Sequence, residues 1–497
     1  MTVVTVAPTT SAARARAVRR ALPALLAGLL AWALLFHAEI AAAVHVWTVS
    51  TAYNHGFIVL PLALWLAWDR RGAASGLLPV PTLLAALAAL PLGLVWFAAD
   101  RLGIMEGRQL AALALLETVL VAWMGWRLAR VFAAPLAYLV FLVPFGAFLT
   151  PALQSFTARF IDVGLTLIGI PHVVTAYLIE IPQGRFVVAE ACAGLRFLVA
   201  AIAFGALYAL LMYRSPRRRL AFLAISCVVP VIANGIRALG IVVLGYILGS
   251  AEAAGADHLI YGWGFFSLVI LLLTVGGLPF REDIGVPAAP AHRAAPPPKP
   301  IVAWAAVAAV ALLAATAPTL AALLDRRAAA GPVPTLPGFT AAGTCRAIDP
   351  PGPVRHFDCA GSELTAAVRA LPAGSGPAAL AAALQTAVPR SAVEADVQGP
   401  LAVGGVTWRL AETLTPARLV ATLAFIDGAP GRGGLAMRLR LARDGFGGGG
   451  GAVVLAASIT PTVLTQAARQ AFTEFLAGQA TLLAAAARAS APRPPAP

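Results

Sequence analysis

Three side chains in this sequence, Cys192, Arg237 and His258, have the types needed for acyl transfer. A cysteine thiol becomes a nucleophile when a base or a positive environment favours its thiolate. A histidine can take up that proton and return one to a leaving amine. An arginine stays protonated and can bind the oxyanion of a tetrahedral intermediate. Together the three types predict thiol-dependent acyl transfer.

Each of the three also has an ordinary structural explanation. A single cysteine beside a helix is usually a small buried hydrophobe, as we expect for Cys227. A histidine near a membrane interface is more often a polar anchor, and an arginine at a helix end usually extends toward water. The chemistry therefore depends on whether the elements of the fold bring the three residues together.

The composition defines what those elements are. Of the 497 residues, 60% are hydrophobic and 12% are charged, and the mean hydropathy is +0.83. Soluble domains carry about 25% charged residues, so we exclude a soluble, disordered or fibrous protein and predict a polytopic α-helical membrane protein. The net charge of +14 comes largely from arginines at the ends of apolar runs. That placement indicates orientation in a bilayer and not nucleic-acid binding.

Nine apolar segments are predicted to cross the membrane, eight in a core and one additional helix, since about 20 helical residues span the hydrocarbon layer. They are residues 21–44, 56–69, 78–99, 109–126, 131–150, 194–213, 220–247, 259–279 and 301–324. The segment 56–69 is short for a span. It is retained because of the charges in the loops.

The basic residues of the loops predict which side each span faces. With the N-terminus inside, the cytoplasmic segments hold 15 basic residues, whereas the outer loops before the last span hold four. The four are Arg101, Arg108, Arg159 and Arg185. This asymmetry follows the positive-inside rule and would vanish without span 56–69. We therefore expect a cell inner membrane protein, with Arg326 and Arg327 as a local exception to the rule.

The same alternation of spans across the membrane places the three reactive side chains at the outer membrane face. Cys192 lies where an outer loop enters a span. Arg237 follows the cytoplasmic Arg219 by about 18 residues, or roughly 27 Å of helix. His258 stands at the outer start of the next span.

Two further regions are predicted outside the membrane. In the outer loop, residues 156–170 are expected to form an interfacial helix, and Pro182-Gln183-Gly184 is expected to turn a β-hairpin between 173–181 and 185–190. The C-terminal part is expected to be an extracytoplasmic α+β domain. Its predicted strands are 404–413, 417–427, 435–441 and 452–459, and its predicted terminal helix is 461–488. Cys345 and Cys359 fit either a disulfide or an unpaired buried pair.

These predictions divide the chain into five parts. They are a basic cytoplasmic N-terminus (1–20), a membrane core (21–280), a Pro/Ala-rich linker (281–300), an additional membrane helix (301–324) and the outer α+β domain (325–497).

Three segments resemble the signature of the exosortase/archaeosortase family in its bacterial form. Val188–Leu195 is similar to a Glu-x-Cys-Ser-Gly block, Asn234–Arg237 to an Asn-x-x-Arg block, and Asp257–Phe266 to a helix that begins near a histidine. The sequence departs from that pattern at Ala193, where the family usually has serine, so a hydroxyl role there is absent or dispensable.

The resemblance extends over residues 20–280. Tyr53–Phe57, followed by Pro61 and Trp65, is similar to an early block of the family. The C-terminal domain resembles only loosely a periplasmic partner domain that some exosortases carry, and it lacks the aromatic, Gln-containing motif expected of that partner. Its role stays open between substrate docking, acceptor delivery and complex assembly.

The resemblance implies a membrane-embedded cysteine protease that acts as a transpeptidase. It assigns Cys192 as the nucleophile, Arg237 as the oxyanion stabiliser and His258 as the general acid/base. Asn234 shares a helix face with Arg237 and is expected to position it. Glu190 and Asp257 are expected either to orient the imidazole or to dock the substrate. No metal or cofactor is expected.

The implied partners are exported proteins with a C-terminal sorting tail. Such a tail has a Pro-Glu-Pro-like motif, a transmembrane helix and a basic cluster, and the nucleophile that accepts the acyl group from the thioester is unspecified. The alternative is a non-enzymatic transporter or export/assembly factor. Transporters usually carry mid-membrane charges and repeated halves. Charges are sparse within these spans, and no repeat is evident.

Overall fold

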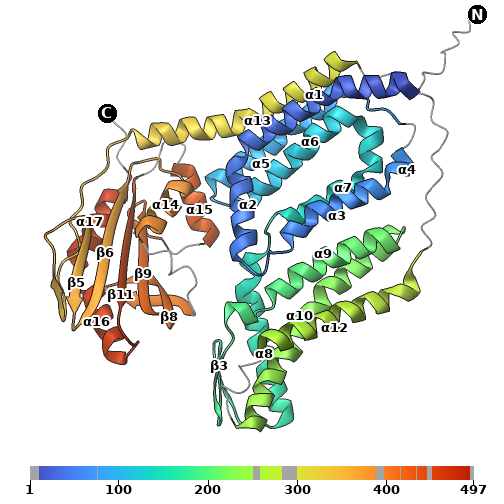
Figure 1. Ribbon diagram of the computed structural model, residues 1–497. Helices are drawn as coiled ribbons and strands as arrows, with labels where there is room; N and C mark the ends of the chain where they lie inside the picture. Colours follow the sequence, from blue (N-terminus) through green and yellow to red (C-terminus); the bar gives the residue numbers. More distant parts are fainter. Residues whose placement is uncertain are drawn as a thin grey trace, which may run out of the picture. The chain divides into compact units, whose positions relative to one another are not determined.

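The computed structural model describes residues 11–74, 77–249, 258–282, 299–387, 397–414, 416–431, 434–444 and 450–492 (Figure 1). The chain divides into two compact units. The first unit comprises residues 1–92 and 109–314, and the second comprises residues 93–108 and 315–497. The first unit is helical with one small sheet, whereas the second is built on a large sheet.

The helical part of the chain follows the predicted apolar segments closely in some places and departs from them in others. Its helices are α1 (Ser11–Leu35), α2 (His37–Val49), α3 (Gly56–Asp69), α4 (Arg71–Ala74), η1 (Leu83–Ala88), α5 (Ala89–Arg101), α6 (Met105–Val131), α7 (Ala133–Tyr138), η2 (Leu139–Leu142), η3 (Ala147–Leu149), α8 (Thr150–Ile168), η4 (Glu190–Cys192), α9 (Leu195–Met212), α10 (Pro216–Leu248), α12 (His258–Gly277), η5 (Leu278–Phe280) and α13 (Pro300–Ala329).

Several of these helices have the length and apolar surface of membrane spans. Within the described residues, six are long and apolar enough to cross a membrane, or seven if the bent pair 133–142 and 147–168 forms one span. Gly56–Asp69 and Gly264–Phe280 are shorter apolar helices. The chain is therefore consistent with a polytopic membrane protein, but the predicted count of nine spans is not confirmed.

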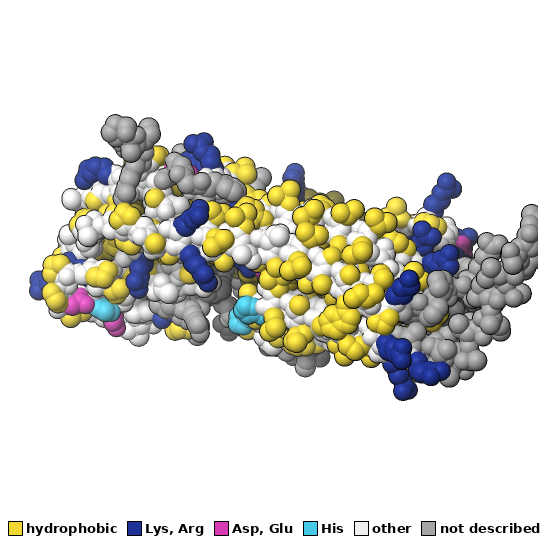
Figure 2. All heavy atoms as spheres, turned by 90° about the horizontal axis from the view of Figure 1, so that it is seen from above, with side chains coloured by type: hydrophobic (Ala, Val, Ile, Leu, Met, Phe, Trp, Pro, Cys, Tyr) yellow, Lys and Arg dark blue, Asp and Glu magenta, His cyan; other side chains and the backbone are white. Residues whose placement is uncertain are grey.

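The surface of these helices is apolar where a bilayer would contact it. Leu26, Leu30 and Leu34 of α1 recur at the four-residue spacing of one helix face and are 57%, 60% and 67% exposed. Figure 2 shows hydrophobic side chains spread over the helical surface in this view, with basic side chains gathered at its end. Lipid contact accounts for leucines that water would not favour at such density.

The predicted span 131–150 is wrong as a continuous helix. The chain leaves the helix after Leu142, adopts an extended conformation at Val143 and resumes as η3 at Ala147, with an angle of 59° across the break. Pro144 has no N–H to continue a helix, and Gly146 has a φ of +115°, which favours glycine. An ideal Cβ at Gly146 would be 3.5 Å from Leu195 Cδ1, so the break lies against the start of α9.

The hairpin predicted within residues 173–190 is confirmed. Strands β1 (Val173–Thr175), β2 (Leu178–Ile181) and β3 (Gly184–Val187) form an antiparallel sheet, and Ile181 pairs with Gly184 at the predicted turn. Ile179 and Ile181 are buried in a cluster that includes Ile161 of α8 and Val242 of α10. This packing fixes the hairpin against the two helices on either side of the Cys192 segment.

Helices α8, α9 and α10 approach one another closely because small residues lie between them. An ideal Cβ at Gly205 would be 2.2 Å from Ser226 Oγ, and one at Gly235 would be 2.8 Å from Phe160 Cγ. Small residues are enriched at such contacts in membrane proteins, where they let backbones approach. The close packing holds the three helices in a defined register.

At the other end of this bundle, Glu282 closes the start of α10. Its Oε2 accepts hydrogen bonds from the main-chain N–H groups of Ser215 at 2.8 Å and Arg214 at 2.5 Å. These hydrogen bonds hold the pKa of Glu282 below its usual range. Tyr208 and Tyr213 donate to the carbonyls of Thr274 and Gly277, so α9, α10 and α12 are joined at this end.

The second unit contains an eight-stranded antiparallel sheet among its described residues. The order is β4-β5-β6-β11-β9-β8-β7, with β10 paired to β9. Its strands are β4 (Cys345–Ala347), β5 (Val354–Cys359), β6 (Ser362–Leu371), β7 (Val397–Val403), β8 (Val406–Leu414), β9 (Ala417–Ile426), β10 (Ala429–Pro430) and β11 (Ala452–Thr460), and its helices are α14 (Pro377–Ala387), α15 (Gly434–Arg443), α16 (Gln466–Ala477) and α17 (Ala480–Ser490).

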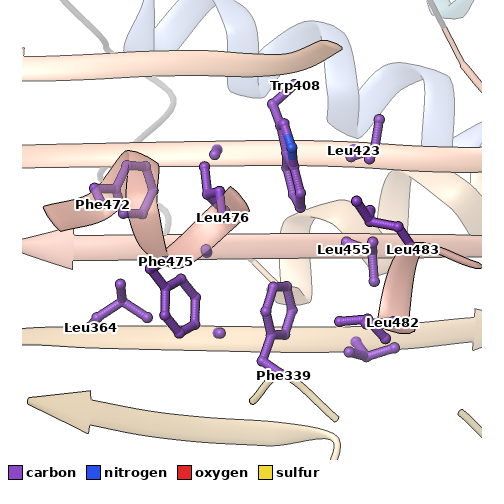
Figure 3. Close-up of a cluster of buried hydrophobic side chains, with 14 of the residues drawn as sticks. Phe339, Leu364, Trp408, Leu423, Leu455, Phe472, Phe475, Leu476, Leu482 and Leu483 are labelled. Carbon is purple, nitrogen blue, oxygen red and sulfur yellow. The ribbon is translucent and has the colours of Figure 1, made fainter. Parts of the chain in front are cut away.

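Helices cover both faces of this sheet. Side chains of α14 and α15 join one apolar cluster with β9 and β11, and those of α16 and α17 join another on the opposite face. Figure 3 shows Phe475, Leu476 and Leu483 of the second cluster gathered with Trp408 and Leu455 of the strands. The rings of Phe339 and Phe475 are stacked, with centroids 5.8 Å apart. The sheet-rich character of the C-terminal part is thus confirmed.

Two elements predicted for the second unit are wrong. The segment 435–441 forms helix α15 and not a strand, because its Leu, Ala, Met and Arg residues favour helix and Met437 and Leu441 share one helical face on the core. The predicted helix 461–488 is two helices, α16 and α17. They separate at Gln479, whose buried amide bonds to the main chain of Thr340.

Strands 404–413, 417–427 and 452–459 are confirmed as β8, β9 and β11 within a few residues. The open question about Cys345 and Cys359 is also answered. Cys345 and Cys359 are opposite each other on β4 and β5, and a disulfide joins them.

Candidate active site

Cys192 is the last residue of η4, a short 3₁₀ turn between β3 and α9. Its side chain is half-buried and packs against the apolar cluster formed by the hairpin, α8 and α10. The segment that leads to it is tied to α8, because Gln154 Nε2 donates a 3.0 Å hydrogen bond to Val188 O. The thiol is therefore held at the junction of a sheet and a helix bundle, partly open to its surroundings.

Asn234 of α10 connects Cys192 to Arg237. Its Nδ2 donates to the main-chain oxygen of Cys192 at 2.9 Å and to Thr157 Oγ1 of α8 at 3.4 Å. Its Oδ1 accepts a 3.3 Å hydrogen bond from Arg237 Nη2. The buried Asn234 amide thus connects three parts of the site through its N–H donor and its oxygen. They are the η4 turn that ends at Cys192 (the cysteine turn), α8 and Arg237.

Gly194 allows this close approach. Its φ is +80°, in the left-handed region that favours glycine. An ideal Cβ at Gly194 would also be 2.5 Å from Asn234 Cγ, closer than real Cβ contacts come. Both the backbone conformation and the space beside Asn234 therefore require glycine two residues after Cys192.

Arg237 is buried inside the bundle. It is 2% exposed, and its guanidinium carbon lies 5.4 Å from the ring centroid of Phe197 on α9. A buried cation is costly unless other groups stabilise it, and here an aromatic face and the Asn234 carbonyl do so. An arginine with an ordinary structural role would extend from a helix end toward water. Arg237 is buried, so this explanation does not apply to it.

His258 is the first residue of α12, and its side chain lies outside the described part of the structure. Asp257 lies outside the described residues altogether. The position of His258 is one helical turn before Gly262, on the same helix face. An ideal Cβ at Gly262 would be 3.7 Å from Arg237 Nη1. The helix that begins with His258 therefore passes close to Arg237 at Gly262.

The remaining predicted site residue, Glu190, is exposed and begins η4. Sequence reasoning assigned no role to Thr157, Arg196, Phe197 or Gly262, which the structure places around Asn234 and Arg237. Arg196 and Phe197 directly follow the block Val188–Leu195 that contains Cys192. This proximity was the one feature of the sequence that could have indicated them. Thr157 lies on α8, and only the folded contact with Asn234 reveals it.

The early block Tyr53–Phe57 forms the turn that leads into α3. An ideal Cβ at Gly56 would be 2.6 Å from the indole of Trp47, and Trp47 Nε1 donates to Leu142 O at 3.1 Å. This turn thereby packs beside the break between η2 and η3. It supports the start of α9 indirectly, through the segment that contacts Leu195.

Two other kinds of site, a metal centre and a second nucleophilic cysteine, find less support in the described residues. Among them no group of three or more His, Cys, Asp or Glu side chains could hold a metal ion. The second free cysteine, Cys227, lies along α10 and is half-buried, so it is less buried than predicted.

The fold and these contacts are those of a polytopic membrane protein in which a cysteine at the end of η4 is joined to an asparagine and a buried arginine in the interior of α10. Residues 47–275 match the model of the family described as Transmembrane exosortase, and this part of the chain belongs to that family. The match includes Cys192, Asn234, Arg237 and His258 and ends before α13 and the C-terminal sheet. No curated protein and no solved structure matches the chain.

Proposed function

We propose that this protein is a membrane-embedded cysteine peptidase and transpeptidase that removes the C-terminal sorting tail of exported proteins. Membership of the exosortase family supports a role in the sorting or processing of proteins at a membrane. The observation that carries the proposal is the Asn234 side chain, which joins the main chain of Cys192 to the guanidinium of Arg237. A nucleophile and an oxyanion-binding cation are thereby held by one group.

In the first half-reaction the Cys192 thiolate attacks the carbonyl carbon of the scissile peptide bond. A carbon–sulfur bond forms, the carbonyl electron pair moves to oxygen, and Arg237 donates hydrogen bonds to that oxyanion. When the intermediate collapses, the carbon–nitrogen bond breaks and His258 gives its proton to the leaving amine. The tail departs, and the exported protein stays bound to Cys192 as a thioester.

In the second half-reaction an acceptor amine, or water, attacks the thioester carbonyl. His258 takes a proton from the attacking group, and the carbon–sulfur bond breaks to release the Cys192 thiolate. The exported protein leaves either joined to the acceptor or hydrolysed. The enzyme returns to its starting protonation state, with a thiolate and a protonated imidazole.

The reaction is proposed to occur on the outer side of the cell inner membrane. The 15-to-4 distribution of basic loop residues supports this orientation. Exported proteins with a Pro-Glu-Pro-like motif, a membrane helix and a basic end would meet the site from that side. Their own helix would hold the scissile bond near the membrane surface.

The test is conversion of an exported, tailed substrate to its shorter form in cells that carry each variant at equal membrane level. Cys192→Ala should abolish conversion, whereas Cys227→Ala, the matched change at the other free cysteine, should leave it intact. Mass spectrometry should also detect the substrate attached to Cys192. A transporter or assembly factor would form no such adduct, and normal conversion by Cys192→Ala would refute the proposal.

A further inference from the structure

Arg196, the second residue of α9, is a cation close to the candidate active site that the reaction above does not use. Its guanidinium carbon lies 4.8 Å from the ring centroid of Phe197, and its Nε is buried. Within the described part of the chain, the Arg196 side chain has no hydrogen-bond or ion-pair partner. A partly buried guanidinium normally pairs with an acceptor, because its desolvation is costly otherwise.

Arg196 and Arg237 converge on one point. The position of an ideal Cβ at Gly262 is 3.7 Å from Arg196 Nη2 and 3.7 Å from Arg237 Nη1. Both guanidinium groups also lie against the same Phe197 ring. Glycine at position 262 has no side chain of its own to occupy this point. Two positive groups that converge on one point favour an anion beside them.

The two arginines differ in what holds them. Arg237 bonds to Asn234 and is 2% exposed, so its geometry is set by the protein. Arg196 is more exposed and has its planar fork of donors available. Glu190, the acidic residue of the cysteine turn, is exposed and makes no ion pair with any described residue. The anion that suits Arg196 must therefore come from outside this turn.

We propose that Arg196, with the space over Gly262 and Phe197, binds the carboxylate of an acidic side chain in the substrate tail, next to the bond that Cys192 attacks. This inference rests on the proposed function and names its specificity-determining contact. A guanidinium and a carboxylate form two parallel hydrogen bonds, which an amide of the same shape cannot reproduce. Arg196 would thereby distinguish glutamate from glutamine in the tail.

The test is a binding measurement with two synthetic peptides, one with Pro-Glu-Pro and one with Pro-Gln-Pro, on the full chain carrying Cys192→Ala in lipid nanodiscs. The glutamate peptide should bind about 10- to 100-fold more tightly, the range for a charge-assisted hydrogen bond. Adding Arg196→Gln should abolish this preference while the glutamine peptide binds as before. If Arg196 had a purely structural role, Arg196→Gln would weaken the binding of both peptides equally. That result would overturn the inference.

Two matched controls separate local effects from general ones. Arg185→Gln removes the same charge from the hairpin, where Arg185 is 76% exposed and paired with Glu180, and should preserve the preference. Gly262→Leu should place a side chain between the two guanidinium groups and weaken binding of the glutamate peptide. Gly264→Leu places the same side chain two residues further along α12, where an ideal Cβ meets nothing within 4 Å, and should have no effect.

The outcomes for this inference and for the proposed function are distinguishable. If the wild-type protein never cleaves a tailed substrate but Arg196 governs the preference for glutamate, the subsite stands and the peptidase proposal fails. If the wild-type protein cleaves both tails equally and Arg196→Gln changes neither binding constant, the peptidase proposal stands and the subsite is refuted.

Discussion

Arg237 offers the sharpest test of the mechanism because its geometry and its charge can be separated. Arg237→Lys keeps the positive charge but loses the planar donors that reach Asn234 and, in our proposal, the oxyanion. Loss of one oxyanion donor lowers a rate by about 100- to 1,000-fold. We therefore expect conversion of the tailed substrate to fall by this amount, measured as initial rate at equal enzyme level.

The matched control for Arg237→Lys is Arg159→Lys. Arg159 is exposed on α8, in the segment that also contributes Thr157 to the site. Its change should leave the rate within twofold of wild type, an order-of-magnitude bound for a surface substitution. A near-normal rate for Arg237→Lys would remove Arg237 from the oxyanion role while leaving Cys192 as the candidate nucleophile.

Gly194 supplies a second prediction, about the shape of the cysteine turn. Gly194→Ala adds a Cβ at a φ of +80° and into the space of Asn234. The left-handed strain alone costs about 1 kcal/mol, and displacing Asn234 would also break its bond to Cys192. We expect conversion to fall at least tenfold while the membrane level changes little. The measurement is conversion per unit of inserted protein.

Gly240→Ala is the control for the cysteine turn. Gly240 lies on α10, and an ideal Cβ there meets nothing within 4 Å. Alanine favours a helix over glycine by about 1 kcal/mol, so this variant should be at least as stable as wild type and equally active. Equal activity in both glycine variants would contradict a rigid link between Gly194 and Asn234.

How much of the site the sequence could predict depends on how local each contact is. Cys192, Asn234 and Arg237 were found from residue types and their block pattern, and the structure brings them together. The partnership of Asn234 with Thr157 joins residues 77 positions apart, and no local pattern encodes it. Arg196 was visible beside the cysteine block, but its lack of a partner is a property of the folded neighbourhood.

Helices and strands were predictable where a single pattern of apolar residues dominated a segment. The strongly apolar segments near α3, α9, α10 and α13 were predicted within a few residues. The break between η2 and η3 was missed because hydropathy does not change across Pro144 and Gly146, although both residues interrupt helices. In α15, apolar residues alternate over only seven positions, and helix propensity with burial of Met437 and Leu441 decided the outcome.

Asp444, which follows α15, makes the second unit sensitive to pH. Burial and the neighbouring Asp427 carboxyl raise the pKa of Asp444 to about 6, although Arg443 and Arg440 oppose the shift. Because the folded state binds this proton more tightly than the unfolded chain, the stabilising contribution is complete below the ordinary aspartate pKa. It is lost as the pH rises toward 6.

We therefore expect Asp444→Asn to stabilise the sheet relative to wild type above pH 6 and to have no such effect near pH 4. Hydrogen exchange of β9 and β11 in the full chain at pH 4, 6 and 8 measures the difference. Asp358→Asn, the same substitution at an exposed position on β5, is the matched control. Equal protection of wild type and Asp444→Asn at pH 8 would show that the Asp427–Asp444 pair does not oppose folding.

At the scale of the whole chain, a segment near residue 100 belongs to the same compact unit as the C-terminal sheet. The second unit includes residues 93–108, where Arg101, 3% exposed, bonds to Asp100 and to Asp325. The guanidinium of Arg108 also pairs with Asp100. A linear prediction could not find this connection, because it joins an early membrane hairpin to the end of α13 across 224 residues. Shortening the chain at Phe280 would therefore leave Arg101 without one of its two carboxylate partners.

Orientation in the membrane is the property of the whole molecule on which the proposed reaction depends. The basic-residue asymmetry predicts that Arg219 lies inside and that the chain after Arg327 lies outside. The Cys345–Cys359 disulfide is consistent with the second location, because such bonds persist in oxidising compartments and are rare in the cytosol. The two observations are independent, since one concerns arginines near helix ends and the other a pair of strands.

Reporter fusions provide the final prediction. A phosphatase that is active only outside should be inactive when joined after Arg219 and active when joined after Arg327. In intact cells, Cys345 and Cys359 should react with an alkylating reagent only after a membrane-impermeant reductant has been added. Reaction without reduction, together with an inactive phosphatase after Arg327, would place the C-terminal sheet in the cytoplasm. One of the short helices, α3 or α12, would then not cross the membrane, and Cys192 would have to be located again relative to its exported substrate.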